Sequence, residues 1–208
     1  MNANANNNYP EQNYLYKPEK QQKVMPGQGS YRDITKDGKK TCIISDSIAQ
    51  RINMKYIKRN VKTGNIFKKI YPGSTAEEIK HNMIKVLELN PTLDRVILQV
   101  GSNNVHNRYA SQTTDFDITN TIIKTVELCH RSGVNEVYVA GITCRPGYIQ
   151  KVNNINDLLK RNATGMGYVF INNDNILPDK HLWDDQLHLN KDGLSILEDN
   201  FINILNKR

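Results

Sequence analysis

A serine, a histidine and an aspartate of this chain have the surroundings that nucleophilic acyl transfer requires. Ser47 stands between a short apolar run and a segment of helical spacing, and Asp185 lies three residues before His188 near the C-terminus. A carboxylate at that spacing can bind one ring nitrogen, so that the other serves as a base toward a serine hydroxyl. Each part has an alternative: Ser47 is also a typical helix N-cap, and 183–190 a typical surface loop before the last helix.

Gly73 and Asn103 follow two further apolar runs and supply candidate hydrogen-bond donors. Gly73 belongs to Tyr71-Pro-Gly-Ser74, and Asn103 to Gly101-Ser-Asn-Asn104. A glycine N–H and an amide side chain can stabilise the oxyanion that forms when a serine attacks a carbonyl. Taken singly, both sequences are equally typical of turns, in which Gly and Asn are common.

From Lys39 onward, β-type apolar runs alternate with segments of helical spacing. The apolar runs are 41–45, 64–71, 94–100, 135–143 and 168–172. The helical segments are 48–56, one capped by Ser74 or Thr75, 118–129, 149–166 and 194–205. This alternation predicts an α/β fold, a three-layer α/β/α sandwich with a five-stranded parallel sheet. Ligands of such folds bind beyond the carboxyl ends of the strands. Ser47, Gly73 and Asn103 each follow a predicted strand, whereas the Asp185–His188 pair does not.

Length and composition favour one globular domain with a tail. The chain has 208 residues, 38% of them apolar. Residues 1–36 are rich in Asn and Gln and interrupted by prolines, which predicts a disordered polar tail before a domain at 37–208. No stretch is apolar enough for a signal peptide or a membrane span, and three cysteines are too few for a disulfide framework or a zinc site. A reduced, cytoplasmic protein is expected.

The net charge of +7 is concentrated in one segment without acidic residues. This basic block consists of Arg51, Lys55, Lys58, Arg59, Lys62, Lys68 and Lys69. A patch of one sign attracts phosphates or acidic surfaces, so nucleic-acid or polyanion binding is the alternative function. A solvated helix face followed by an exposed strand explains the block equally well.

Four features of the sequence, taken together and in chain order, resemble the blocks of the SGNH (GDSL-type) hydrolase superfamily over residues 39 to 205. They are the segments that carry Ser47, Gly73, Asn103 and the Asp185–His188 pair. The resemblance implies a flavodoxin-like fold and a serine esterase that acts on small acyl esters, with acetyl as the expected acyl group, without a metal or cofactor. It assigns Ser47 as nucleophile, His188 as base and Asp185 as its orienting acid. The N–H groups of Ser47 and Gly73 and the side-chain amide of Asn103 would form the oxyanion hole.

Two departures and one narrower resemblance accompany this assignment. Ser45 replaces the usual Gly before the Asp-Ser pair, and Asn104 replaces the usual Asp after the oxyanion Asn. Because of these departures, a further interpretation is that the chain is a degenerate hydrolase retained for protein contacts. The C-terminal stretch is also similar to esterase domains in first-open-reading-frame proteins of LINE-type retrotransposons. Tyr109, Arg145 and Tyr148 are candidates for the lining of the substrate pocket.

Overall fold

The computed structural model describes residues 37–106, 113–143 and 145–207. The predicted tail at 1–36 lies outside the described residues, as does Tyr109. No helix within the described ranges is both long and apolar enough to cross a bilayer.

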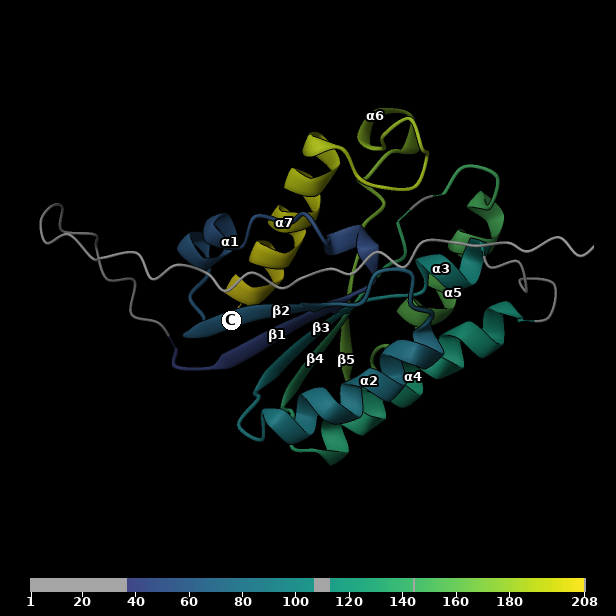
Figure 1. Ribbon diagram of the computed structural model, residues 1–208. Coiled ribbons are helices and arrows are strands. Elements are labelled where there is room, and N and C mark those ends of the chain that lie inside the picture. Colours follow the sequence, from purple (N-terminus) through teal and green to yellow (C-terminus); the bar gives the residue numbers. More distant parts are fainter. Residues whose placement is uncertain (1–36, 107–112, 144, 208) are drawn as a thin grey trace, which may run out of the picture. The chain divides into compact units, whose positions relative to one another are not determined.

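Five parallel strands form one sheet in the order β2-β1-β3-β4-β5 (Figure 1). They are β1 (Lys40–Ser45), β2 (Asn65–Ile70), β3 (Arg95–Gln99), β4 (Glu136–Ala140) and β5 (Tyr168–Ile171). The inner strands β1 and β3 are almost wholly buried, as expected for a parallel sheet covered on both faces. The predicted α/β fold with a five-stranded parallel sheet is confirmed.

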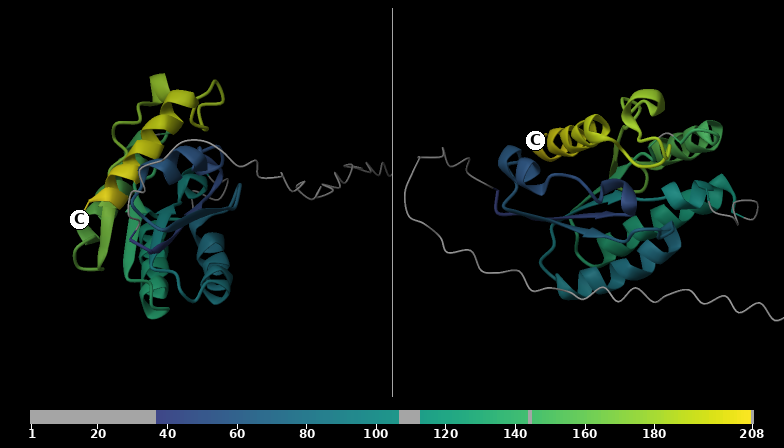
Figure 2. Two further views of the ribbon diagram at one scale, coloured as in Figure 1. Left: turned by 90° about the vertical axis from the view of Figure 1, so that its left-hand side faces the viewer. Right: turned by 45° about the horizontal axis from the view of Figure 1, so that its top comes forward.

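Helices cover both faces of the sheet (Figures 1 and 2). On one face lie α2 (Ala76–Leu89), α4 (Asp115–Arg131) and α5 (Ile149–Asn162), whose apolar side chains pack with Cys42, Val96 and Val137. On the other face lie the 3-10 helix η1 (Ser47–Ala49), α1 (Met54–Asn60) and α7 (Lys191–Asn206), which pack on Ile43 and Ile97. The core is therefore divided into two apolar layers by the sheet.

The prediction of one continuous helix at 48–56 is wrong. The structure has the short η1 and a separate α1, because the Asn53 side chain accepts hydrogen bonds from the backbone N–H groups of Lys55 and Tyr56. An N-cap at this point ends the preceding segment and starts a new helix. Two short helices that the apolar pattern does not reveal are α3 (Ser102–His106), expected as a turn, and α6 (Pro178–His181).

Close backbone packing fixes the start of α7 against α6. Asn190 caps α7 by accepting from Asp192 and Gly193, and its own amide donates to the carbonyl of Lys180 at 2.8 Å. A Cβ atom on Gly193 would lie only 2.4 Å from the carbonyl oxygen of His181. This position therefore needs glycine for a close approach between two backbones, and the approach holds the 182–190 loop in place.

Replacing Gly193 by Ala should push α7 from α6 and lower the free energy of unfolding by about 1–3 kcal/mol. Gly165→Ala is the matched control, because a Cβ there meets nothing nearer than 3.9 Å. Urea denaturation of both variants checks the difference. Equal stability of the two variants would contradict the packing argument.

Candidate active site

Ser47, His188 and Asp185 come together at the carboxyl edge of the sheet, the edge at which the strands end. His188 Nε2 lies 3.2 Å from the Ser47 hydroxyl oxygen, and His188 Nδ1 lies 2.7 Å from the Asp185 carboxylate. Ser47 follows β1 directly, whereas the other two belong to the loop between α6 and α7. With its proton on Nδ1, a neutral His188 donates to Asp185 and leaves Nε2 to accept the serine proton.

The loop that carries the pair is folded around the Asp185 carboxylate. One carboxylate oxygen accepts from the backbone N–H groups of Leu187 and His188, each at 2.9 Å, while the other binds the imidazole. The backbone N–H of Trp183 closes the turn by donating to the carbonyl of His188 at 2.9 Å. Asp185 therefore orients the histidine through both its backbone and its ring.

Electrostatics keep this aspartate charged. The hydrogen bond from the His188 ring, assisted by the two backbone donors, lowers the pKa of Asp185 to about 2. The side chains of His188 and Asp185 are 38% and 49% exposed, so the pair lies in an open, shallow position. Such a carboxylate stays ionised at every pH at which the neutral imidazole can act as a base.

The candidate oxyanion donors lie in the loops after β1, β2 and β3. Among the described residues, the backbone N–H groups of Ser47 and Gly73 have no acceptor. The Asn103 side chain donates one amide hydrogen to the carbonyl of Ser74 at 3.0 Å, which ties it to the Gly73 turn and leaves its second hydrogen available. Gly73 adopts a φ of 78°, a left-handed conformation that suits glycine.

Ser45, at the position of the first departure, fits without displacing the turn. Its side chain is fully buried, and its hydroxyl accepts from the backbone N–H of Ala49 at 3.3 Å. Its carbonyl accepts from Tyr71 at 2.8 Å, which joins the loops after β1 and β2. The extra side chain is therefore part of the η1 capping rather than an obstruction.

Asn104, the second departure, anchors the start of α2. Its carbonyl oxygen accepts from the backbone N–H of Ala76 at 2.7 Å, and its amide donates to the Glu77 carboxylate at 2.8 Å. An aspartate would keep the first bond but would bring two carboxylates together. The presence of Glu77 gives a physical reason for an amide at this position.

Two charged residues behind the nucleophile have structural roles that the sequence patterns do not reveal. Asp46 is 1% exposed and Arg145 is 8% exposed, although charged side chains are rarely buried to this extent. Arg145 donates to the carbonyl of Ser102 at 2.9 Å, and Tyr148 packs edge-on against the ring of His106. Arg145 therefore lies against the backbone just before Asn103. The only feature of the sequence that pointed to Arg145 was its position in the loop that follows β4.

Two neighbouring lysines of the basic block, Lys68 and Lys69, face opposite sides of the sheet. Lys68 donates to the carbonyls of Gln50 and Ile52, at 2.7 and 3.3 Å, on the side of the sheet that carries α1. Its neighbour Lys69 points to the opposite face, because successive strand residues alternate. The continuous run in the sequence is thus divided by the edge strand β2.

Acidic residues of α7 also lie beside the block. Glu198 accepts from the backbone N–H of Asn53 at 2.6 Å, and Asp199 accepts from the Tyr56 hydroxyl at 3.0 Å. The segment lacks acidic residues in the sequence, but the fold supplies them from a distant part of the chain. The local positive field is correspondingly reduced.

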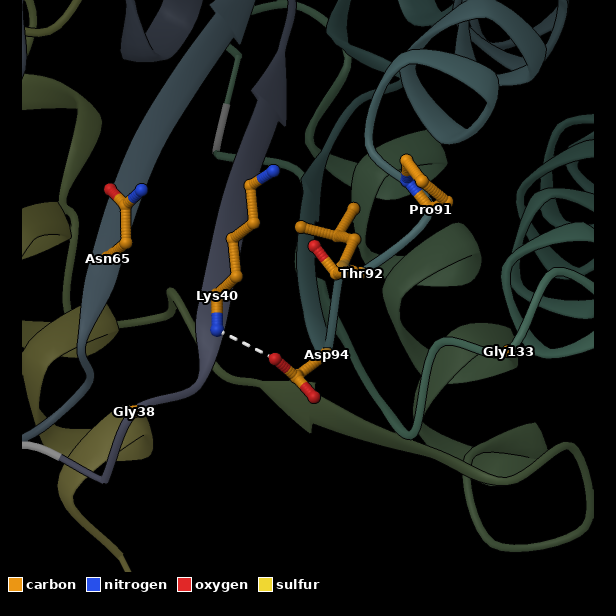
Figure 3. A pocket seen from close by; sticks show the side chains of 8 residues that line it. Gly38, Lys40, Asn65, Pro91, Thr92, Asp94 and Gly133 are labelled. Atoms are coloured by element: carbon orange, nitrogen blue, oxygen red, sulfur yellow. Dashed lines mark hydrogen bonds between the residues drawn. The ribbon is translucent and has the colours of Figure 1, made fainter.

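A cavity of about 480 Å³ lies at the opposite edge of the sheet (Figure 3). Its lining includes Lys40 and Asn65, at the starts of β1 and β2, and Asp94, whose carboxylate accepts from the Lys40 backbone N–H at 2.8 Å. Because parallel strands all start at this edge, the cavity is separated from Ser47 by the length of the strands. It is not part of the triad site.

The fold is shared with solved hydrolase structures at low sequence identity. A GDSL-like lipase from Bacteroides thetaiotaomicron aligns with a TM-score of 0.69 and 15% identity over 80% of this chain and 87% of that one. The aryl esterase of M. smegmatis gives 0.67 and 14% over 81% and 98%. An acetyl esterase solved with an acetate ion gives 0.62 and 14% over 80% and 98%. No protein-family model and no curated protein matches the sequence.

Asn104→Asp should lower the free energy of unfolding at neutral pH by about 1–3 kcal/mol, because a buried donor is replaced by a charge facing Glu77. Adding Glu77→Gln should recover much of the loss, since the glutamine amide can donate to the new carboxylate. Denaturation of the single and double variants measures the coupling. Additive effects of the two changes would refute the proposed contact.

The stability contributed by Asp46 should depend on pH in an unusual direction. Burial raises the pKa of Asp46 from 3.8 to about 6, although backbone donors and the charges of Arg145 and His188 oppose the rise. The folded state therefore binds this proton more tightly than the unfolded state. The unfolding free energy of the wild type, relative to Asp46→Asn, should fall as the pH rises from about 4 to about 6 and then level off. Urea denaturation of both proteins across this pH range tests the direction of the change. A rise of this free-energy difference with pH, as expected for a carboxylate with a lowered pKa, would contradict the prediction.

Proposed function

We propose that the chain is a serine esterase in which Ser47, His188 and Asp185 form a catalytic triad. The observation that carries the proposal is the continuous chain of hydrogen bonds from Asp185 through both ring nitrogens of His188 to the Ser47 hydroxyl. An ordinary helix-capping serine has no need of a histidine that is itself held by a carboxylate. The N–H groups of Ser47 and Gly73, which have no acceptor in the part of the chain that the structure describes, add the second requirement of acyl transfer.

The proposed reaction proceeds through an acyl-enzyme. Ser47 Oγ attacks the ester carbonyl while its proton passes to His188 Nε2, and Asp185 stabilises the imidazolium that forms. The Ser47 and Gly73 N–H groups and the Asn103 amide stabilise the oxyanion of the tetrahedral intermediate. His188 then returns the proton to the departing alcohol. Water, activated by the same base, releases the acid and regenerates the serine hydroxyl.

Small acyl esters, with acetate as the first choice, are the proposed substrates. The triad pair is open to solvent, so an ester on a larger molecule can approach without first entering a deep channel. The comparison proteins described as lipase, aryl esterase and acetyl esterase share the fold, which supports ester chemistry but leaves the alcohol portion unassigned.

Polyanion binding is the less favoured function, because Lys69 faces away from Lys68 and the block has acidic neighbours from α7. The link to retrotransposon proteins stays a prediction from the C-terminal resemblance. Neither of these is required by the proposed hydrolysis.

The proposal predicts that the wild type hydrolyses p-nitrophenyl acetate and that Ser47→Ala and His188→Ala each lower kcat/KM by at least about a thousandfold. Asp185→Asn should also reduce kcat, because an amide cannot hold the required tautomer in the same way. Assays with longer acyl chains would then define the acyl preference.

Ser132→Ala and His81→Ala are the matched controls, since both residues are exposed and lie far in the sequence from every member of the triad. They should retain wild-type rates. Hydrolysis that survives both Ser47→Ala and His188→Ala in folded proteins would disprove the assignment.

A further inference from the structure

Arg145 is a buried cation beside the proposed active site. Only 8% of it is exposed, and its guanidinium donates to the carbonyl of Ser102 at 2.9 Å. Removing a guanidinium from water is costly unless hydrogen bonds and an opposite charge compensate. The loop after β4 therefore places a charge here for a reason other than solubility.

Asp46 supplies the opposite charge. It is 1% exposed, and one carboxylate oxygen accepts from the backbone N–H of Ile48 at 3.0 Å. Its other oxygen has no hydrogen-bond partner among the described residues. The charges that act on it are those of Arg145 and His188, and the nearby Ser102 backbone N–H also favours its ionised form.

Ser102 is the residue that these two charges share. The Arg145 guanidinium binds its carbonyl, and its backbone N–H is one of the groups that favour the ionised form of Asp46. The carbonyl of Ser102 belongs to the peptide that leads into Asn103, whose amide is tied to the Gly73 turn through Ser74. A change in the Ser102 peptide would therefore move an oxyanion donor with respect to the nucleophile, which directly follows Asp46.

We propose that Arg145 is a positioning residue that holds the Asn103 amide in the oxyanion hole by binding the Ser102 carbonyl, with Asp46 as its buried counter-charge. The inference rests on the proposed function. Arg145 contacts neither the substrate nor the reacting atoms in this role, and no proton passes through it. Lysine is not an equivalent, because the guanidinium is planar and directs several N–H groups at once.

The test compares Arg145→Ala and Arg145→Lys with the wild type in p-nitrophenyl acetate hydrolysis, with and without millimolar guanidinium ion. Arg145→Ala should lower kcat by about ten- to a hundredfold, as expected when a stabilising group is slightly misplaced. KM should change by less than about threefold, because ground-state binding is not affected. Guanidinium ion should restore part of the lost kcat in Arg145→Ala, and lysine should rescue it poorly.

Arg95→Ala is the matched control. Arg95 is equally buried, but it lies at the start of β3 and pairs with Asp37 and Glu136 at the opposite edge of the sheet. Loss of this arginine should reduce stability while leaving the kcat of the folded fraction, and its response to guanidinium ion, unchanged. Circular dichroism and active-site titration of each variant give that fraction.

The double variant Asp46→Asn/Arg145→Ala, compared with the two single variants, provides a second, independent readout. If the two charges balance each other, the double variant should lose less kcat than the product of the two single losses. Independent effects would overturn the role of Asp46 as counter-charge. A kcat for Arg145→Ala within twofold of wild type, a loss confined to KM, or equal rescue of Arg95→Ala would overturn the positioning role. These outcomes are separate from failure of the esterase proposal, which Ser47→Ala and His188→Ala decide.

Discussion

The parallel register of β1 with its two neighbours is the constraint on which the site depends. Ser45 at the end of β1 pairs with Ile70 of β2 and Gln99 of β3, so the three strands end side by side. The chain segments that follow them must therefore begin at the same edge. This places Ser47 near the turn that carries Gly73 and near Asn103 at the start of α3, although the three residues are far apart in the sequence. A shift of one strand by a residue would break this arrangement and expose buried side chains.

The other two residues of the proposed triad are held in place in a different way. His188 and Asp185 lie in a loop with little regular structure, which is fixed at one end by the close approach of α6 and α7 at Gly193. Within the loop, the Asp185 carboxylate binds two backbone N–H groups as well as the imidazole. The same charge therefore shapes the loop and orients the base, and its substitution affects both.

Local patterns were sufficient for the strands, for most helices and for singling out the three residues that the structure brings together, because each depends on a short stretch of sequence. Thr75 and Glu78, for example, form the capping box that starts α2 where a cap was predicted. The break between η1 and α1 at Asn53 was not predicted, because the apolar spacing continues across this residue although its side chain caps a new helix. The relation between Asp46 and Arg145 could not be predicted, since it depends on which strands are neighbours. That order is set by packing across the sheet rather than by any local signal.

The division of the basic block by β2 has a consequence for self-association. β2 is an edge strand, so one row of its N–H and C=O groups lacks a partner strand within the sheet order described. Such an edge is a template for strand addition by another molecule, and lysines along it oppose that addition because a second copy would bring like charges together. Lys68 and Lys69 place one positive charge toward each face of this strand. Like charges at these positions therefore disfavour the addition of a second copy along the open side of the sheet.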